Sequence, residues 1–130
     1  MIQEDKELLL KDLSARLSCG VKVLDTAEDL NEICELDSIM TSRKYNKVFV
    51  GLTLPDDAIM TGIEMVKPYL RPMSSMTEEE RREYDVLASY FDGISMAESI
   101  DWLNSHHFDY RALIDRGLAI EVTSDNNPYN

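Results

Sequence analysis

Hydrophobic spacing predicts a helix at the start of the chain, followed by a short strand. Leu10, Leu13 and Leu17 recur at helical spacing over residues 5–18, and Gly20 follows where helices commonly end. From Val21 the period changes to two, as expected of a half-buried strand. We therefore expect a helix over 5–18 and a strand over 21–25.

Three further strands are predicted in the first half of the chain. They cover residues 33–40, 47–54 and, as a short edge strand, 61–66. The turn at 43–46 would join the first two of these as an antiparallel hairpin. Pro55-Asp56-Asp57 would end the strand at 54, because proline lacks an amide donor and aspartate favours turns.

The second half of the chain is predicted to form a crossover followed by helices. Two prolines make residues 67–72 a rigid crossover. Thr77-Glu78-Glu79-Glu80 is a capping box that starts a helix over 77–91, and Ser95-Met96-Ala97-Glu98 repeats the pattern for a helix ending near His107.

A last short helix is predicted before the chain ends. Asp109 would cap it and Gly117 would terminate it, with 118–122 extended after it. Together these elements predict an α+β fold in a single compact domain over residues 1–122. Its N-terminal helix precedes a small, mostly antiparallel sheet, and the C-terminal helices pack on one sheet face. Residues 123–130 form a polar tail that offers little to bury and should fray.

Length and composition agree with one ordinary domain. The 130 residues are 44% hydrophobic and 29% charged, which is normal for a globular chain. No apolar stretch approaches the ~20 residues of a membrane-spanning helix, and the start MIQEDKE is acidic where a signal peptide is basic. We expect a soluble, cytoplasmic protein whose two cysteines are reduced thiols.

The charge balance is strongly acidic. Thirteen Lys and Arg against twenty-five Asp and Glu give a net charge of −12, and residues 25–37 contain six acids and no base. Such a charge repels phosphates and anionic lipids, so direct binding of nucleic acid or membranes is disfavoured. It favours solubility, or attraction to a basic partner.

Three stretches resemble a group of short uncharacterised proteins. They are KELLLKDLSARLSCGVKV, VKPYLRPMSSMTEEER and DWLNSHHFDYRALIDRGLAIE. Together they resemble proteins of Bacteroides and related gut bacteria or their phages. The resemblance implies a bacterial or phage cytoplasmic setting and assigns no activity to any position.

Candidate chemistry is sparse. His106, His107 and Asp109 carry zinc or iron donors, but adjacent helical residues point about 100° apart, so a metal site is disfavoured. Cys19 and Cys34 have no local catalytic partner, and no phosphate-binding glycine loop occurs. The sequence therefore predicts no catalytic, cofactor-binding or metal-binding residue and no cofactor.

A partner surface is predicted in the second half of the chain, because aromatic and arginine side chains are common interface anchors. Its candidate members are Tyr69, Arg71, Val86, Tyr90, Trp102 and His106. The leading hypothesis is a non-enzymatic accessory protein that binds another protein or itself as a homo-oligomer. The alternatives are a small metal-dependent hydrolase using His106, His107 and Asp109, and an acidic inhibitor of a DNA-handling protein.

Overall fold

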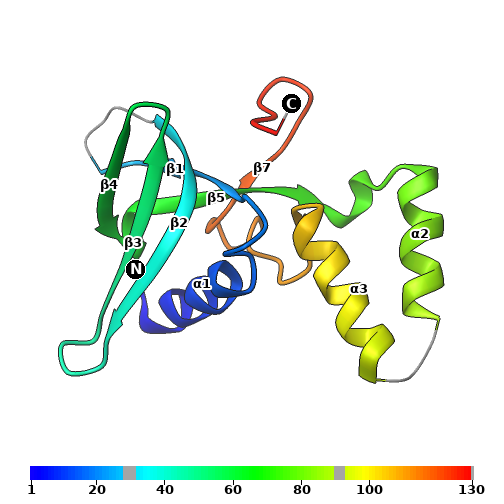
Figure 1. Cartoon of the computed structure of the whole chain (residues 1–130), viewed down its shortest axis with the longest axis horizontal. Coiled ribbons are helices and arrows are strands. Elements are labelled where there is room, and N and C mark those ends of the chain that lie inside the picture. Colours follow the sequence, from blue (N-terminus) through cyan, green and yellow to red (C-terminus); the bar gives the residue numbers. More distant parts are fainter. Residues whose placement is uncertain (28–31, 90–92, 130) are drawn as a thin grey trace.

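The computed structural model describes residues 1–27, 32–89 and 93–129 (Figure 1). The helices are α1 (Gln3–Ala15), α2 (Glu78–Ala88) and α3 (Gly93–Ser105), with 3-10 turns η1 (Ile63–Met65) and η2 (Met73–Ser75). The strands are β1 (Lys22–Asp25), β2 (Glu32–Ser42), β3 (Lys47–Leu54), β4 (Asp57–Gly62), β5 (Val66–Pro72), β6 (Phe108–Asp109) and β7 (Ile120–Glu121). The expected α+β fold, with an N-terminal helix and C-terminal helices, is confirmed.

The strands form one mixed sheet in the described part of the chain. Its order is β4-β3-β2-β1-β5-β6, and β7 also pairs with β5. Neighbours from β4 to β5 are antiparallel, whereas β6 and β7 run parallel to β5. The strands expected at 21–25, 33–40 and 47–54 are confirmed, as is the turn at 43–46.

Two predictions between residues 54 and 72 are wrong. The edge strand is Asp57–Gly62 rather than 61–66, because Pro55 and Asp56 form a two-residue turn that sets Leu54 opposite Asp57. The chain thus reverses at once instead of leaving the sheet. Residues 67–72 belong to strand β5 and are not a crossover, since the extended backbone that proline favours also suits a strand.

The helical predictions need three corrections. Helix α2 does start at its capping box, with the Glu80 amide donating to Thr77 Oγ1 at 3.1 Å and the Thr77 amide to Glu80 Oε1 at 3.0 Å. Helix α3 begins at Gly93, so Ser95 lies inside it instead of capping it, and it ends at Ser105, before the expected His107.

The third correction concerns the short helix expected after Asp109: residues 110–117 form loop and turns, and no helix. Ala112 has a φ of 58°, in the left-handed region that interrupts helices. Asp109 nevertheless accepts the amides of Leu113 and Ile114, both at 2.9 Å. Gly117 takes the expected left-handed conformation, with a φ of 74°.

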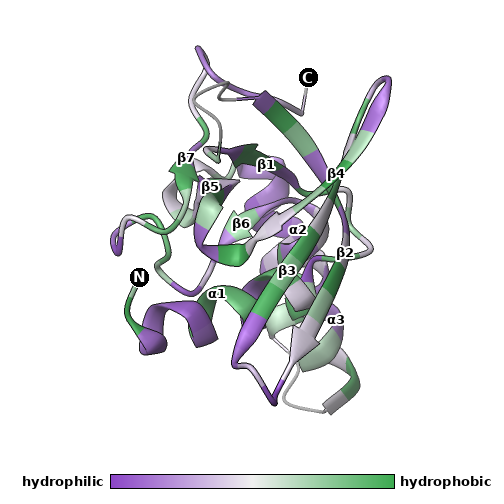
Figure 2. Cartoon of the chain, turned by 90° about the vertical axis from the view of Figure 1, so that its left-hand side faces the viewer, coloured by the Kyte–Doolittle hydropathy of each residue, from purple (hydrophilic) through white to green (hydrophobic). Residues whose placement is uncertain are grey.

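The core lies between α1 and the sheet. Leu9 and Leu13 of α1 are fully buried against strand residues that include Val23, Val50 and Leu52. Figure 2 shows hydrophobic colour along β3 and hydrophilic colour on the first turns of α1. The helices α2 and α3 lie beyond one end of β5, away from β4 (Figure 1), and α2 has no buried residue.

Arg16, at the end of α1, is completely buried. Its Nε and Nη2 donate to the Asp12 carboxylate at 2.8 and 3.2 Å, and Nη2 also donates to the Phe108 carbonyl at 2.6 Å. Arg111 adds a second ion pair to Asp12, at 3.4 Å. This buried cluster ties the first helix to a segment ninety-two residues later in the chain.

The end of the chain is packed, contrary to the expectation that it frays. The Tyr129 hydroxyl accepts the Lys22 amide at 3.1 Å and donates to the Tyr69 carbonyl at 2.6 Å. The ring stacks on His107, with centroids 3.7 Å apart. Burial raises the pKa of Tyr129, so the phenol stays protonated. Residues 123–130 look polar in the sequence because these contacts all come from their one tyrosine, Tyr129.

Replacing Arg16 should test the buried cluster. We expect Arg16→Met to lower the free energy of unfolding by about 3 kcal/mol or more, because Asp12 then stays buried with a weaker partner. The double variant Asp12→Leu with Arg16→Met should recover part of that loss. Urea denaturation measures both. A loss below about 1 kcal/mol for the single variant would show that the pair is dispensable.

Removing the Tyr129 hydroxyl should test the docked tail. We expect Tyr129→Phe to lower the free energy of unfolding by about 1–2 kcal/mol, since the Lys22 amide and the Tyr69 carbonyl lose their partner while the ring stack remains. Tyr45→Phe, at a residue that is 65% exposed, is the matched control and should change little. Equal effects in the two variants would contradict the docking.

Candidate functional site

The predicted partner residues do not lie on one exposed surface. Tyr69 is only 7% exposed, so its ring is covered in this structure, whereas Val86 is 60% exposed on α2. Arg71 is occupied by a bidentate contact to Glu80, at 2.8 and 2.7 Å. Tyr90 lies outside the described residues. The exposure expected for Val86 is therefore present, and that of Tyr69 is not.

Trp102 and His106 belong to an aromatic stack that supports the helix pair. The Trp102 ring lies 4.0 Å from the His106 ring and 5.7 Å from the Phe108 ring, measured between centroids. Its Nε1 donates to Glu83 of α2 at 3.2 Å. The Arg71 guanidinium lies 4.2 Å from the Phe108 centroid. These contacts connect β5, α2, α3 and β6, which gives Trp102 and Arg71 a structural role.

Glu80 connects the Arg71 side chain of β5 to the start of α2. Hydrogen bonds from Arg71, with smaller contributions from Thr77, lower the pKa of Glu80 from 4.5 to about 2, against the opposing effect of burial. The same carboxylate thus holds β5 and closes the capping box of α2. One charged side chain fixes where this exposed helix begins.

The two histidines and Asp109 do not converge. His106 Nδ1 lies 2.8 Å from the Trp102 carbonyl oxygen, while His107 stacks on Tyr129. Burial, with Arg16 and other nearby cationic groups, lowers the pKa of His107 to about 4. Both Asp109 oxygens accept backbone amides. No three His, Cys, Asp or Glu residues in the described part of the chain are arranged to hold a metal. The geometry therefore gives the hydrolase hypothesis no support.

A groove lies at the other end of the molecule, in the strands. We call it the sheet-end groove; it holds about 680 Å³. It is lined by Asp25, Ala27, Glu32, Leu54, Pro55, Asp56, Asp57, Ile59, Met60 and Thr61. These residues come from the end of β1, the start of β2 and the β3–β4 hairpin, which share one end of the sheet because the strands are antiparallel. The groove is thus framed by two hairpin ends.

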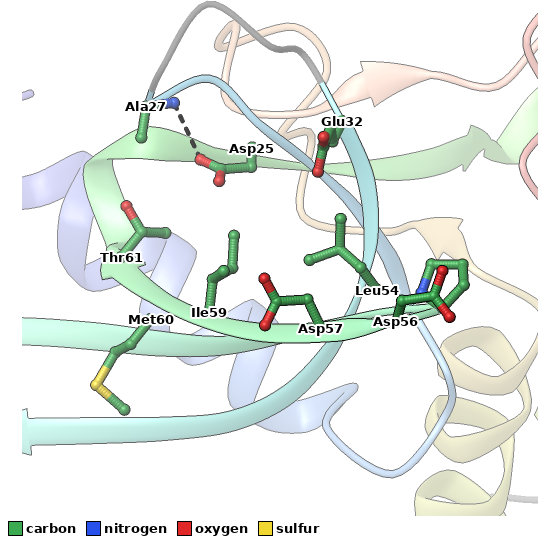
Figure 3. Close-up of a pocket in the computed structure, with 10 residues that line it drawn as sticks. Asp25, Ala27, Glu32, Leu54, Asp56, Asp57, Ile59, Met60 and Thr61 are labelled. Carbon is green, nitrogen blue, oxygen red and sulfur yellow. Dashed lines mark hydrogen bonds between the residues drawn. The ribbon is translucent and has the colours of Figure 1, made fainter.

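The groove has an apolar floor and an acidic rim. In Figure 3, Leu54, Ile59 and Asp57 point into the hollow, Asp25 and Glu32 lie across from them, and Met60 points away. Leu54 and Ile59 are half-buried against the hydrophobic core. A bound side chain could therefore contact hydrocarbon below and carboxylates above.

The carboxylates of the rim have no cationic partner within the part of the chain that the structure describes. Among the described residues, none of Asp25, Glu32, Asp56 and Asp57 forms an ion pair. Asp25 instead accepts the Ala27 amide at 3.0 Å, and Asp57 accepts the Ala58 amide at 2.8 Å. Burial, reinforced by Asp25 and Glu32, raises the pKa of the nearby Cys34 thiol. The groove thus favours positive charge and keeps this thiol neutral.

Sequence reasoning missed this groove. Its signals in the sequence were the acidic run at 25–37 and the segment 57–62, which forms the unrecognised strand β4. The other acids are spread widely: α1 carries Glu4 and Glu7, and α2 carries Glu78 and Glu79, on separate parts of the molecule (Figure 1). These acids do not form the single acidic face that an inhibitor of a DNA-handling protein would need. The acidic-inhibitor hypothesis stays a prediction.

Comparison with known proteins adds no assignment. No model of a known protein family, no curated protein and no solved structure matches this chain. None of the helices in the described ranges is both long and apolar enough to cross a bilayer. The candidate site therefore rests on the residues of this chain alone.

The low pKa of Glu80 predicts a pH-dependent contribution to stability. Because the folded value of about 2 lies below the ordinary 4.5, the carboxylate stabilises the fold above pH 4.5 and loses this effect as the pH falls toward 2. Glu80→Gln keeps the capping box but removes the charge. We expect its deficit in melting temperature, relative to the natural chain, to shrink between pH 5 and pH 2.5. A constant deficit would contradict this role.

Proposed function

We propose that this protein is a non-enzymatic accessory protein that binds a basic segment of another protein in the sheet-end groove. The observation that carries the proposal is the groove itself, in which an apolar floor faces four carboxylates without cationic partners among the described residues. The bacterial or phage cytoplasm that the sequence resemblance implies is part of this proposal.

Lysine and arginine suit both parts of such a groove. Their aliphatic stems can lie on apolar residues such as Leu54 and Ile59 while their charged ends reach carboxylates such as Asp25 and Glu32. The net charge of −12 attracts a basic segment over a longer range. Together these features support selective binding of a cationic partner, with an on-rate that falls as salt increases.

Binding of basic peptides tests the proposal. The probes are three labelled, capped peptides of equal charge: oligolysine, a helix-forming lysine–leucine peptide and an alternating lysine–valine peptide. We expect at least one to bind in fluorescence anisotropy, with affinity that falls steeply with salt. The variant Asp25→Asn with Glu32→Gln should weaken binding about fivefold, since two partly exposed charge pairs are worth about 1 kcal/mol together.

A second pair of substitutions controls for net charge. Glu98→Gln with Asp101→Asn removes the same two charges from exposed positions on α3, away from the groove (Figure 1). Asn at position 25 keeps the oxygen that accepts the Ala27 amide, so the turn is preserved. Binding that both pairs of substitutions weaken equally, or no binding by any peptide, would overturn the proposal.

A further inference from the structure

Strand β4 is an open edge of the sheet in the described part of the chain. It is the terminal strand, and within the described residues it pairs only with β3. Its sequence, DAIMTG, contains no Lys, Arg or Pro, which commonly protect such edges. Its register with β3 is continuous from Asp57 to Gly62, without the irregularity that β2 has near Leu36. A regular edge of this kind is a template for another strand.

The opposite edge of the sheet, beside β5, is organised differently. There β5 pairs with the two-residue strands β6 and β7, and very short strands are a common way to protect an edge. The contrast singles out β4 as the edge available to a partner.

This edge borders the sheet-end groove. Asp57, Ile59, Met60 and Thr61 of β4 contribute to its lining. Ile59 and Thr61 stand opposite the buried Leu52 and Val50, which places them on the core side of the sheet, whereas Met60 is 55% exposed. A strand added to β4 would alternate in the same way, with one set of side chains on the groove side and the other on the side of Met60.

We propose that the bound segment is extended and adds to β4 as a new edge strand, with alternating lysine or arginine residues directed into the groove. This inference rests on the proposed function and names the conformation of the partner. Backbone hydrogen bonds to β4 supply affinity, and the carboxylates select the cationic side chains.

Charge decides between a partner segment and a second copy of this chain. Two β4 edges paired together would bring two acidic rims close to each other, and each chain carries a net charge of −12. Like charges oppose that association, whereas a basic segment neutralises the rim. The occupant is therefore a basic segment of another protein.

Backbone methylation of the lysine–valine peptide tests strand addition. In an extended strand, the amides of successive residues point to opposite sides, so all lysine amides face one side and all valine amides the other. One peptide is N-methylated on every lysine and a second on every valine. We expect one of them to bind at least about tenfold more weakly than the parent peptide, and the other to retain most of its affinity.

Hydrogen exchange of the full-length protein provides a second readout. Saturation with the unmethylated peptide should slow exchange at outward-facing amides of β4, and leave α2 unchanged. Equal affinity of the two methylated peptides, equal loss in both, tighter binding of the helix-forming peptide, or no added protection in β4 would overturn strand addition. Each of these results would leave the proposed function standing if groove-charge removal still weakens binding.

Self-pairing is separated by sedimentation. We expect the protein without peptide to sediment as a monomer at low salt. A dimer with β4 amides already protected would assign the edge to a second copy and overturn the proposed occupant.

Discussion

The buried charge of Arg16 determines how helix α1 meets the segment around Phe108. Its guanidinium is fully inaccessible, and it is held by Asp12 one turn earlier and by the carbonyl of Phe108. An unpaired charge in a protein interior costs several kcal/mol, so these partners have to arrive together. The fold is thereby required to bring residue 108 to the end of α1. Few hydrophobic contacts impose so specific a match between distant segments.

The position of the helix pair follows from that match. Phe108 lies beside Trp102 and beneath Arg71, and Arg71 holds the carboxylate that also caps α2. Helix α2 buries none of its residues, so hydrophobic packing alone does not place it. Charged and aromatic contacts that begin at β5 and β6 do so instead. The residues expected to bind partners, Arg71, Trp102 and His106, hold this region together.

The groove and the free edge lie at the opposite end of the sheet, where neither helix of the pair reaches (Figure 1). Two hairpin ends frame the groove, and the core supports its floor through Leu54 and Ile59. A partner could occupy it without disturbing the Arg16 cluster. The proposed binding site is thus built on strands that the rest of the fold already holds in place, which lowers the entropy cost of binding.

The sequence by itself determined the features that depend on neighbouring residues. The hydrophobic period located α1, β1, β2 and β3, and the Thr77–Glu80 capping box located the start of α2. Glycine at position 117 indicated a left-handed turn. These signals act over a few neighbouring residues. Local pattern did not reveal that Pro55-Asp56 reverses the chain into β4, or that 67–72 joins the sheet, since proline suits turns, crossovers and extended strands alike. The groove, the Arg16 cluster and the docking of Tyr129 were decided only by tertiary structure. Each joins residues that are far apart in the chain, and only the folded sheet brings their charges and hydroxyls within contact distance.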